Sequence, residues 1–369
     1  MLAHPAQVAH GAASHPGGSP QASGHPKGQP WDLSVRPVIV IWEVTHACAL
    51  ACVHCRASAD PFRHPEELTT EEGYALIDSV ARLNPGLFVL TGGDPLMRED
   101  LFDLIAYAKS RGLRVSAAPA GTARATPEAM ERFREAGVDS LSFSLDGPDA
   151  VTHDTFRRVR GTFDRTLKAM DAAREAGVPF QINTTVTRTT QPHLDRLREL
   201  VQIMGAVQWD LFILVPTGRG RQLEALSPEE YESFLDWLAE VADEAPFRVK
   251  TTEGPQFRRV QAQRRGQPPE TLRPGVNAGK GYVFISNRGK VYPSGFLPLE
   301  VGDVRQQPLE HIYWESPILK ALRDPSRLKG RCGRCPYKHH CGGSRSRAYA
   351  ETGDLFAEDP LCGFQPEAC

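Results

Sequence analysis

The chain has 369 residues, of which 40% are hydrophobic and 24% are charged, and its formal net charge is −2 at pH 7. This is the composition of a globular protein, long enough for one large domain and a smaller one. Such a small net charge argues against nucleic acid or an anionic membrane as a partner. No apolar run has the length of a transmembrane helix.

The first thirty residues are rich in Pro, Gly, Ala and His and lack the continuous apolar core of a signal peptide. The histidines in this segment, which could bind a metal ion, are His4, His10, His15 and His25. Because this composition cannot bury a core, we expect residues 1–34 to be a disordered tail. The lack of an export signal predicts the cytoplasm, where thiols stay reduced. The eight cysteines of the chain then indicate metal binding or catalysis instead of disulfides.

Six strand–helix units follow the tail in regular alternation. Each joins a short apolar or β-branched run to a segment with helical spacing of its apolar residues. The expected strands cover residues 36–44, 86–93, 113–119, 139–147, 179–187 and 208–218. The expected helices cover residues 69–84, 97–112, 126–137, 161–177, 193–205 and 227–244. We therefore predict a parallel α/β domain over residues 35–246, either an open sheet or a barrel, with its functional face at the loops after the strands.

The pattern changes after residue 246. A Gly-rich stretch is followed by a predicted hairpin over residues 282–296, which turns at Asn287–Gly289. Five of the eight cysteines then lie between Cys332 and the last residue, Cys369. We expect residues 247–369 to form a smaller, cysteine-rich domain.

Three cysteines directly follow the first predicted strand. Cys48, Cys52 and Cys55 are separated by three and two residues, and three thiols cannot all pair as disulfides. They could bind zinc, with His46 or His54 as the fourth ligand, or they could hold an iron–sulfur cluster. Three protein ligands would leave one iron of a four-iron cluster open for chemistry.

This cysteine spacing resembles that of the radical S-adenosylmethionine (radical SAM) superfamily, and two further motifs support the resemblance. The sequence TGGDP, residues 91–95, is similar to the Gly-Gly-Glu-Pro motif of the family, with Asp94 in place of glutamate. The sequence SFSLDG, residues 142–147, ends the fourth predicted strand. The resemblance covers about residues 35–245. It implies a partial (β/α)6 TIM-like barrel in which the three cysteines hold a [4Fe-4S] cluster and the open iron binds S-adenosylmethionine.

The resemblance also implies an enzymatic activity. In this family the reduced cluster cleaves S-adenosylmethionine to a 5′-deoxyadenosyl radical, which abstracts hydrogen from the substrate. Cys48, Cys52 and Cys55 are then the catalytic residues. The electron would come from a donor such as ferredoxin or flavodoxin. The cofactor supplies the difficult chemistry, and the protein orients it and excludes water.

By the same resemblance, a set of residues is expected to bind S-adenosylmethionine. These are His54, Gly92, Gly93, Asp94, Pro95, Ser144, Asp146, Asn183 and Thr185. The two glycines let the backbone approach the methionine amino group closely. Asp94 is one methylene shorter than glutamate, so we expect the contact there to come mainly from the loop backbone. Ser144 and Asp146 are expected near the ribose and the carboxylate, and His54 beside the adenine.

The second cysteine cluster contains Cys332, Cys335 and Cys341, with gaps of two and five residues, and then Cys362. Four thiolates could form a structural zinc site. In a chain that also carries the radical SAM motifs, this segment resembles the C-terminal SPASM domain of that superfamily, which binds auxiliary four-iron clusters.

The resemblance to the SPASM domain is incomplete. A full domain holds two auxiliary clusters, and Ser294 and Arg345 stand where further cysteine ligands are expected. No cysteine lies between Cys55 and Cys332. We therefore predict one auxiliary [4Fe-4S] cluster. Cys369 is expected to be a spare thiol, and the alternative is that it substitutes as a ligand of this cluster.

Residues 42–57 and 341–362 resemble a branch of the family that acts on iron tetrapyrroles. This branch includes the oxidative decarboxylase of iron-coproporphyrin and its relatives in denitrification-type heme synthesis. Arginine suits the propionates of such a substrate, and Arg56, Arg219 and Arg345 are the candidates. The alternative substrate is a ribosomally made peptide. An alternative of another class is a non-enzymatic zinc or iron–sulfur protein, which would not bind S-adenosylmethionine.

Overall fold

The computed structural model describes residues 31–366, and the residues from Asp32 onward belong to one compact unit. The four N-terminal histidines and Cys369 lie outside the described residues. Within the described part of the chain, no helix combines the length and the apolar character needed to cross a bilayer.

A ten-stranded sheet organises this unit, with the strand order β10-β9-β8-β1-β2-β3-β4-β5-β6-β7. Its strands are β1 Ile39–Thr45, β2 Leu87–Gly92, β3 Val115–Ala117, β4 Ser140–Ser144, β5 Phe180–Val186, β6 Gln208–Ile213, β7 Arg248–Thr252, β8 Tyr282–Ile285, β9 Lys290–Tyr292 and β10 Gly302–Asp303. Strands β1 to β7 run parallel to one another, and β8 runs parallel to β1. The short strands β9 and β10 are antiparallel additions at one edge.

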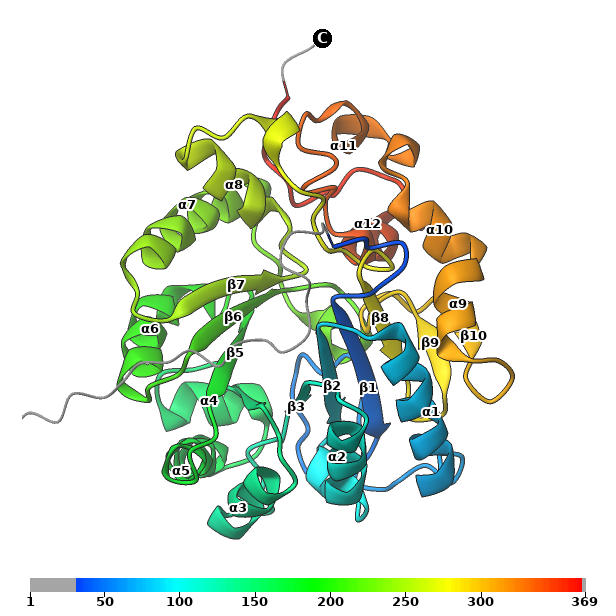
Figure 1. Ribbon diagram of the computed structural model, residues 1–369. Coiled ribbons are helices and arrows are strands. Elements are labelled where there is room, and N and C mark those ends of the chain that lie inside the picture. Colours follow the sequence, from blue (N-terminus) through cyan, green and yellow to red (C-terminus); the bar gives the residue numbers. More distant parts are fainter. Residues whose placement is uncertain (1–30, 367–369) are drawn as a thin grey trace, which may run out of the picture. The chain divides into compact units, whose positions relative to one another are not determined.

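Helices connect the strands and cover the outer side of the sheet (Figure 1). They are α1 Thr70–Leu83, α2 Leu101–Ser110, α3 Pro127–Glu135, α4 Ala150–Arg157, α5 Thr162–Glu175, α6 Leu194–Ile203, α7 Pro228–Glu244, α8 Gln256–Arg264, α9 Leu309–Glu315, α10 Pro317–Arg323, α11 Gly330–Arg334 and α12 Arg345–Thr352. All six predicted strand–helix units are present, and the strands curve into an incomplete barrel. The prediction of a partial (β/α)6 barrel is confirmed.

The first strand shows why the sequence folds this way. Val40, Trp42 and Val44 alternate along β1 and are fully buried on the helix side, whereas Ile39 and Ile41 point to the barrel interior. A strand with apolar residues on both faces needs cover on both faces, as parallel strands do. The covering helix α1 begins at a capping box formed by Thr69 and Glu72, which satisfies its first free N–H groups.

The residues after 246 extend this sheet at both edges. β7 was not predicted from the sequence, because its residues RVKTT are polar and none of them is fully buried. The predicted hairpin is present as β8 and β9, and β8 pairs with β1 on the other side of the barrel. The C-terminal segment therefore contributes walls to the barrel itself, in addition to carrying the second group of cysteines.

Candidate active site

A cavity of about 300 Å³ occupies the barrel interior and reaches the loops that follow the strands. The thiols of Cys48, Cys52 and Cys55 lie on its wall. Its volume is at the lower end of the range for small-molecule sites, which is about 300–1,000 Å³. The predicted functional face is therefore hollow, and it carries the predicted reactive cysteines.

The loop that carries these cysteines is held by contacts from the segment after β6. Arg219, in the loop after β6, donates from Nε to the Cys52 carbonyl oxygen at 2.9 Å and from Nη1 to the Ala59 carbonyl oxygen at 3.1 Å. Gly218 packs directly against the loop, because a Cβ at this position would lie 2.3 Å from the Arg56 carbonyl oxygen. The sequence places three thiols in one loop, and these contacts make that loop rigid.

The chemistry of the three thiols fits a metal cluster. Cys48 and Cys52 are buried and Cys55 is partly buried. Burial raises the pKa of the Cys48 thiol to about 12, and the neighbouring thiols add to the shift. A thiol in such a place becomes a thiolate only when a nearby cation stabilises its charge, which is what a bound metal does.

The two glycines of TGGDP pack against the start of the cysteine loop. A Cβ on Gly92 would lie 2.5 Å from the Thr45 carbonyl oxygen, and a Cβ on Gly93 would lie 2.4 Å from the Ala47 carbonyl oxygen. The end of β2 therefore packs closely on the start of the cysteine loop. Both glycines border the cavity, so their backbone is open to a ligand there.

Asp94 and Pro95, the last residues of the same motif, do not border the cavity. The Asp94 carboxylate is fully buried and accepts hydrogen bonds from the Thr122 hydroxyl at 2.7 Å and from the Ala120 and Leu96 N–H groups. Burial raises the pKa of this carboxyl. Asp94 thus connects the loop after β2 to the loop after β3 and lies behind the cavity wall.

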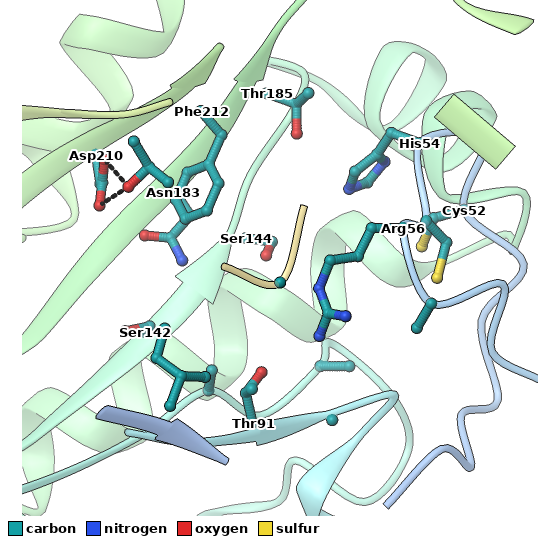
Figure 2. A pocket seen from close by; sticks show the side chains of 18 of the residues that line it. Cys52, His54, Arg56, Thr91, Ser142, Ser144, Asn183, Thr185, Asp210 and Phe212 are labelled. Atoms are coloured by element: carbon teal, nitrogen blue, oxygen red, sulfur yellow. Dashed lines mark hydrogen bonds between the residues drawn. The ribbon is translucent and has the colours of Figure 1, made fainter. Parts of the chain in front are cut away.

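Ser144, at the end of β4, and Asn183 and Thr185, on β5, line the cavity. Figure 2 shows them across the cavity from Cys52, His54 and Arg56. Asp146 lies behind them and does not border the cavity; its carboxylate accepts the Thr185 N–H at 2.6 Å and pairs with Arg157.

His54 also borders the cavity, and its ring stacks on Phe156 with 4.7 Å between the centroids. Burial, with a smaller effect of the nearby Arg157 cation, lowers the pKa of His54 to about 4, so the ring is neutral near pH 7. Its Nδ1 is buried and has no hydrogen-bond partner in the described part of the chain. A neutral ring with a free nitrogen is suited to pack beside a planar, polar ligand.

The arginines considered as carboxylate ligands differ in their surroundings. Arg56 points into the cavity, and its guanidinium lies 4.3 Å from the centroid of the Phe284 ring (Figure 2). Arg219 borders the cavity but is engaged by the cysteine loop. Arg345 does not border the cavity. Its Nη1 donates to the carbonyl oxygens of Leu355 and Ala357 in the C-terminal segment.

Two basic residues at the site were not found from the sequence. Lys250, on the unpredicted strand β7, borders the cavity and pairs with Asp210 at 2.9 Å. Arg157, on the unpredicted helix α4, lies beside the Cys52 sulfur. Helix α4 could have been recognised from Asp149, which caps its first turn by accepting the Thr152 N–H at 3.0 Å.

The four cysteines of the C-terminal segment also come together. Cys332, Cys335, Cys341 and Cys362 border one small cavity. Burial raises the pKa of all four thiols, that of Cys362 to about 12. Among residues 31–366, no three His, Cys, Asp or Glu side chains converge closely enough to share a single metal ion; the thiols of each group border a cavity.

The two residues that replace further cysteines are engaged elsewhere. The Ser294 hydroxyl donates to the Glu253 carboxylate at 2.9 Å, which also accepts hydrogen bonds from the Ser344 and Ser346 hydroxyls. Arg345 donates to the backbone around the second thiol group and approaches the Cys332 sulfur at 3.8 Å. One four-thiol group is thus present, in agreement with the predicted single auxiliary cluster.

Comparisons with known proteins agree with this geometry. The radical SAM superfamily model matches residues 42–201, and the model of SPASM, an iron–sulfur cluster-binding domain, matches residues 277–336. The chain is 42% identical to an AdoMet-dependent heme synthase of Methanosarcina barkeri, over 89% of this chain and 97% of the relative. It is 39% identical to an AdoMet-dependent heme synthase of Nitratidesulfovibrio vulgaris, over 99% and 98%.

The fold has a counterpart among solved structures. The crystal structure of Streptococcus suis SuiB bound to S-adenosylmethionine superposes with a TM-score of 0.69 at 14% identity, and the match covers 89% of this chain and 78% of that one. At this level of identity the likeness concerns the fold. Together with the sequence matches, it means that the chain belongs to the radical SAM superfamily and carries a SPASM domain.

Proposed function

We propose that this radical SAM enzyme acts on a propionate-bearing tetrapyrrole in the maturation of a heme-type cofactor. The observation that carries the proposal is the match over nearly the whole chain to two proteins named AdoMet-dependent heme synthase. The chain covers at least 97% of either relative, so both the barrel and the cysteine-rich segment are shared.

The family's cofactors are S-adenosylmethionine and [4Fe-4S] clusters, here one in the radical SAM domain and one in the SPASM domain. When bound, they supply an organic radical able to remove a hydrogen atom from an unactivated carbon. We propose that Cys48, Cys52 and Cys55 hold the first cluster. The proposed ligands of the auxiliary cluster are Cys332, Cys335, Cys341 and Cys362.

The chain's own residues would position S-adenosylmethionine. The exposed backbone of Gly92 and Gly93 and the side chains of Ser144, Asn183 and Thr185 face one cavity. His54 offers a neutral ring there for the adenine. Asp94, Pro95 and Asp146 remain proposed contributors, and their positions behind the wall support an indirect role through the loops that they connect.

The remaining cavity wall suits a flat molecule with acidic edges. Arg56 and Lys250 are cations on this wall, and Phe212, Phe284 and Phe296 provide apolar faces. In the described part of the chain, the ion-pair partner of Arg56 is Glu43 at 3.7 Å, which leaves donors of its guanidinium free for a carboxylate. We propose Arg56 as a propionate ligand, whereas Arg219 and Arg345 hold the protein's own backbone.

We further propose an acidic electron carrier such as ferredoxin or flavodoxin as the donor, and the cytoplasm as the compartment. Residues 325–350 contain seven Arg and Lys and no Asp or Glu, although the net charge of the chain is −2. This segment contains three of the four thiols of the second group. Lys329, Arg331 and Arg347 pair with nearby acids, but Arg327 and Arg334 are exposed, and such charge attracts an acidic partner near the redox centre. The described cysteines are free thiols, which fits a reducing compartment.

The substrate can be tested by binding. Iron-coproporphyrin and its tetraester, in which the propionates are blocked, would be titrated into anaerobic enzyme loaded with S-adenosylmethionine, and porphyrin absorbance would be followed. We expect saturable binding of the acid and markedly weaker binding of the ester. Equal binding of the two, or none, would contradict a propionate-reading site and favour a peptide substrate. A protein that lacks iron and carries only zinc would contradict both enzymatic alternatives.

A further inference from the structure

The last residue of helix α4, Arg157, connects two functional elements of the barrel. Its Nη1 lies 3.6 Å from the Cys52 sulfur, and its Nη2 forms an ion pair with the Asp146 carboxylate. The side chain is 9% exposed, and its Nε has no partner among the described residues. A buried guanidinium therefore divides its donors between a carboxylate and one of the three thiols.

This position is fixed from both sides. The Asp146 carboxylate also accepts the Thr185 N–H at 2.6 Å, so the end of β5 holds the acid in place. The last turn of α4 is tied to the cysteine loop, because the Val53 N–H donates to the Phe156 carbonyl oxygen at 3.0 Å. The fold therefore holds both the Asp146 carboxylate and the end of α4 in place around Arg157.

The three thiols have different hydrogen-bond environments. The Cys48 sulfur accepts the Leu50 backbone N–H at 3.3 Å. The Cys52 sulfur accepts a charged donor from Arg157. No hydrogen bond to the Cys55 sulfur is found in residues 31–366. The environment is therefore asymmetric, with the cationic donor aimed at one sulfur.

We propose that Arg157, through its hydrogen bond to the Cys52 sulfur, raises the reduction potential of the cluster held by the three cysteines. This inference rests on the proposed function of those cysteines as cluster ligands. Reduction adds one electron to the cluster, and part of the added charge resides on its sulfurs. Hydrogen bonds to the sulfurs and nearby charge are among the factors that set the potential of such clusters. In a buried site the cation stabilises the more negative, reduced state, and Asp146 holds the cation in place.

The first test is a redox titration of the reconstituted holoenzyme followed by electron paramagnetic resonance. The relevant cluster is identified as the one whose spectrum changes on addition of S-adenosylmethionine. We expect Arg157→Gln to lower the equilibrium constant for reduction of this cluster by about tenfold. This corresponds to a potential about 59 mV more negative for one electron. Arg157→Lys, which keeps the charge but loses the fork, should recover part of the shift. The exposed Arg160, on the same segment, provides the matched control: Arg160→Gln should have the wild-type potential.

The second test uses the unaltered sequence and so does not depend on the folding of a variant. Protein labelled with 15N-arginine would be examined by pulsed paramagnetic resonance in the reduced state without S-adenosylmethionine. We expect a weak 15N coupling in the signal of the cluster that responds to S-adenosylmethionine, which disappears in Arg157→Lys and persists in Arg160→Gln, whereas any coupling of Arg345 to the auxiliary cluster should be the same in all three proteins.

The outcomes separate the two proposals. If wild-type protein shows no cluster that responds to S-adenosylmethionine, the assignment of the three cysteines fails. If the cluster is present but the 15N coupling is absent, or if loaded Arg157→Gln keeps the wild-type potential, the cysteines stand and the role of Arg157 is wrong.

Discussion

The Asp94 carboxylate accepts a hydrogen bond from the Thr122 hydroxyl at 2.7 Å, facing away from the cavity that Gly92 and Gly93 of the same motif border. Asp94 is therefore a link between the loops after β2 and β3. We expect Asp94→Ala to lower the free energy of unfolding by about 1–3 kcal/mol, because buried N–H and hydroxyl donors lose their acceptor. Anaerobic urea denaturation measures this effect.

Thr122→Val is the matched comparison for Asp94, because it removes one of the same hydrogen bonds and keeps the backbone ones. Its cost should be smaller, about 1 kcal/mol. If Asp94→Ala keeps full stability and loses only affinity for S-adenosylmethionine, then Asp94 is a direct ligand, and its role as a link between the two loops is wrong.

The close packing of Gly218 against the cysteine loop predicts a second effect. Gly218→Ala places a Cβ 2.3 Å from the Arg56 carbonyl oxygen, so the loop must move, and the backbone φ of +53° is unfavourable for alanine. We expect the first cluster to be lost or loosely held, as a fall in iron content and in the signal that responds to S-adenosylmethionine. Gly220→Ala, two residues along, meets its nearest atom at 3.5 Å and should load normally. Equal loading of the two variants would contradict this account.

The two thiol groups should differ in function. Cys48→Ala removes one of the three proposed ligands of the first cluster, so cleavage of S-adenosylmethionine should be abolished. Cys335→Ala alters the second group, so cleavage should remain measurable while turnover of the substrate falls. The measurements are 5′-deoxyadenosine and product formed per enzyme. Cleavage at the wild-type rate in Cys48→Ala would refute the first assignment, and unimpaired turnover in Cys335→Ala would reduce the second site to a structural one.

His153 gives the protein a predictable response to acid. Its Nδ1 accepts the Asp146 N–H at 3.2 Å, and burial, with a smaller effect of Arg157, lowers its pKa from 6.5 to about 4. The unfolded chain therefore binds this proton at a higher pH than the folded one. The stability that the neutral ring supports is complete above about pH 6.5 and is lost as the pH falls toward 4.

The magnitude is about 1.4 kcal/mol for each pH unit within that interval. Denaturation at pH 7 and pH 5 should show a smaller loss of stability in His153→Gln than in the wild type, because the Gln carbonyl can accept the same N–H without titrating. The same pH dependence in both proteins would exclude His153 as the cause.

The position of Arg56 on the cavity wall leads to a prediction about substrate binding. Arg56→Gln should raise the KM for the tetrapyrrole by about tenfold or more, since a hydrogen bond to a charged group contributes about 1.5–3 kcal/mol. The affinity for S-adenosylmethionine should stay unchanged, and Arg56→Lys should recover part of the loss. Arg114→Gln, an exposed position outside the cavity, is the control. A loss confined to S-adenosylmethionine binding would mean that Arg56 holds the cofactor's carboxylate.

The sequence predicted most of the barrel because its strands and helices carry strong local signals. β1 begins with the apolar run Ile39–Trp42, and a glycine follows four of the six predicted helices and marks where each of those four ends. β7 and α4 were missed for opposite reasons. β7 is a mostly polar strand whose register is set by pairing with β6. α4 is a helix of eight residues in which Val151 is exposed while His153 and Arg157 are buried, so apolar residues do not mark its buried face.

The same division applies to the site. Cys48, Cys52 and Cys55 were predicted because their chemistry is encoded in local spacing, and Gly92 and Gly93 because a close approach requires glycine. The directions of Asp94 and Asp146 were not predictable, since the partners that turn them from the cavity, Thr122 and Arg157, lie on other elements. Lys250 and Arg157 reach the site only through tertiary packing.

The most direct test of the central claim is the formation of 5′-deoxyadenosine by anaerobically reconstituted enzyme with reductant and S-adenosylmethionine, measured with and without iron-coproporphyrin. We predict that the porphyrin stimulates cleavage and loses carbon dioxide from its propionates. Slow cleavage that the porphyrin does not change, with both clusters shown to be present, would contradict the tetrapyrrole as substrate and turn the search to a peptide.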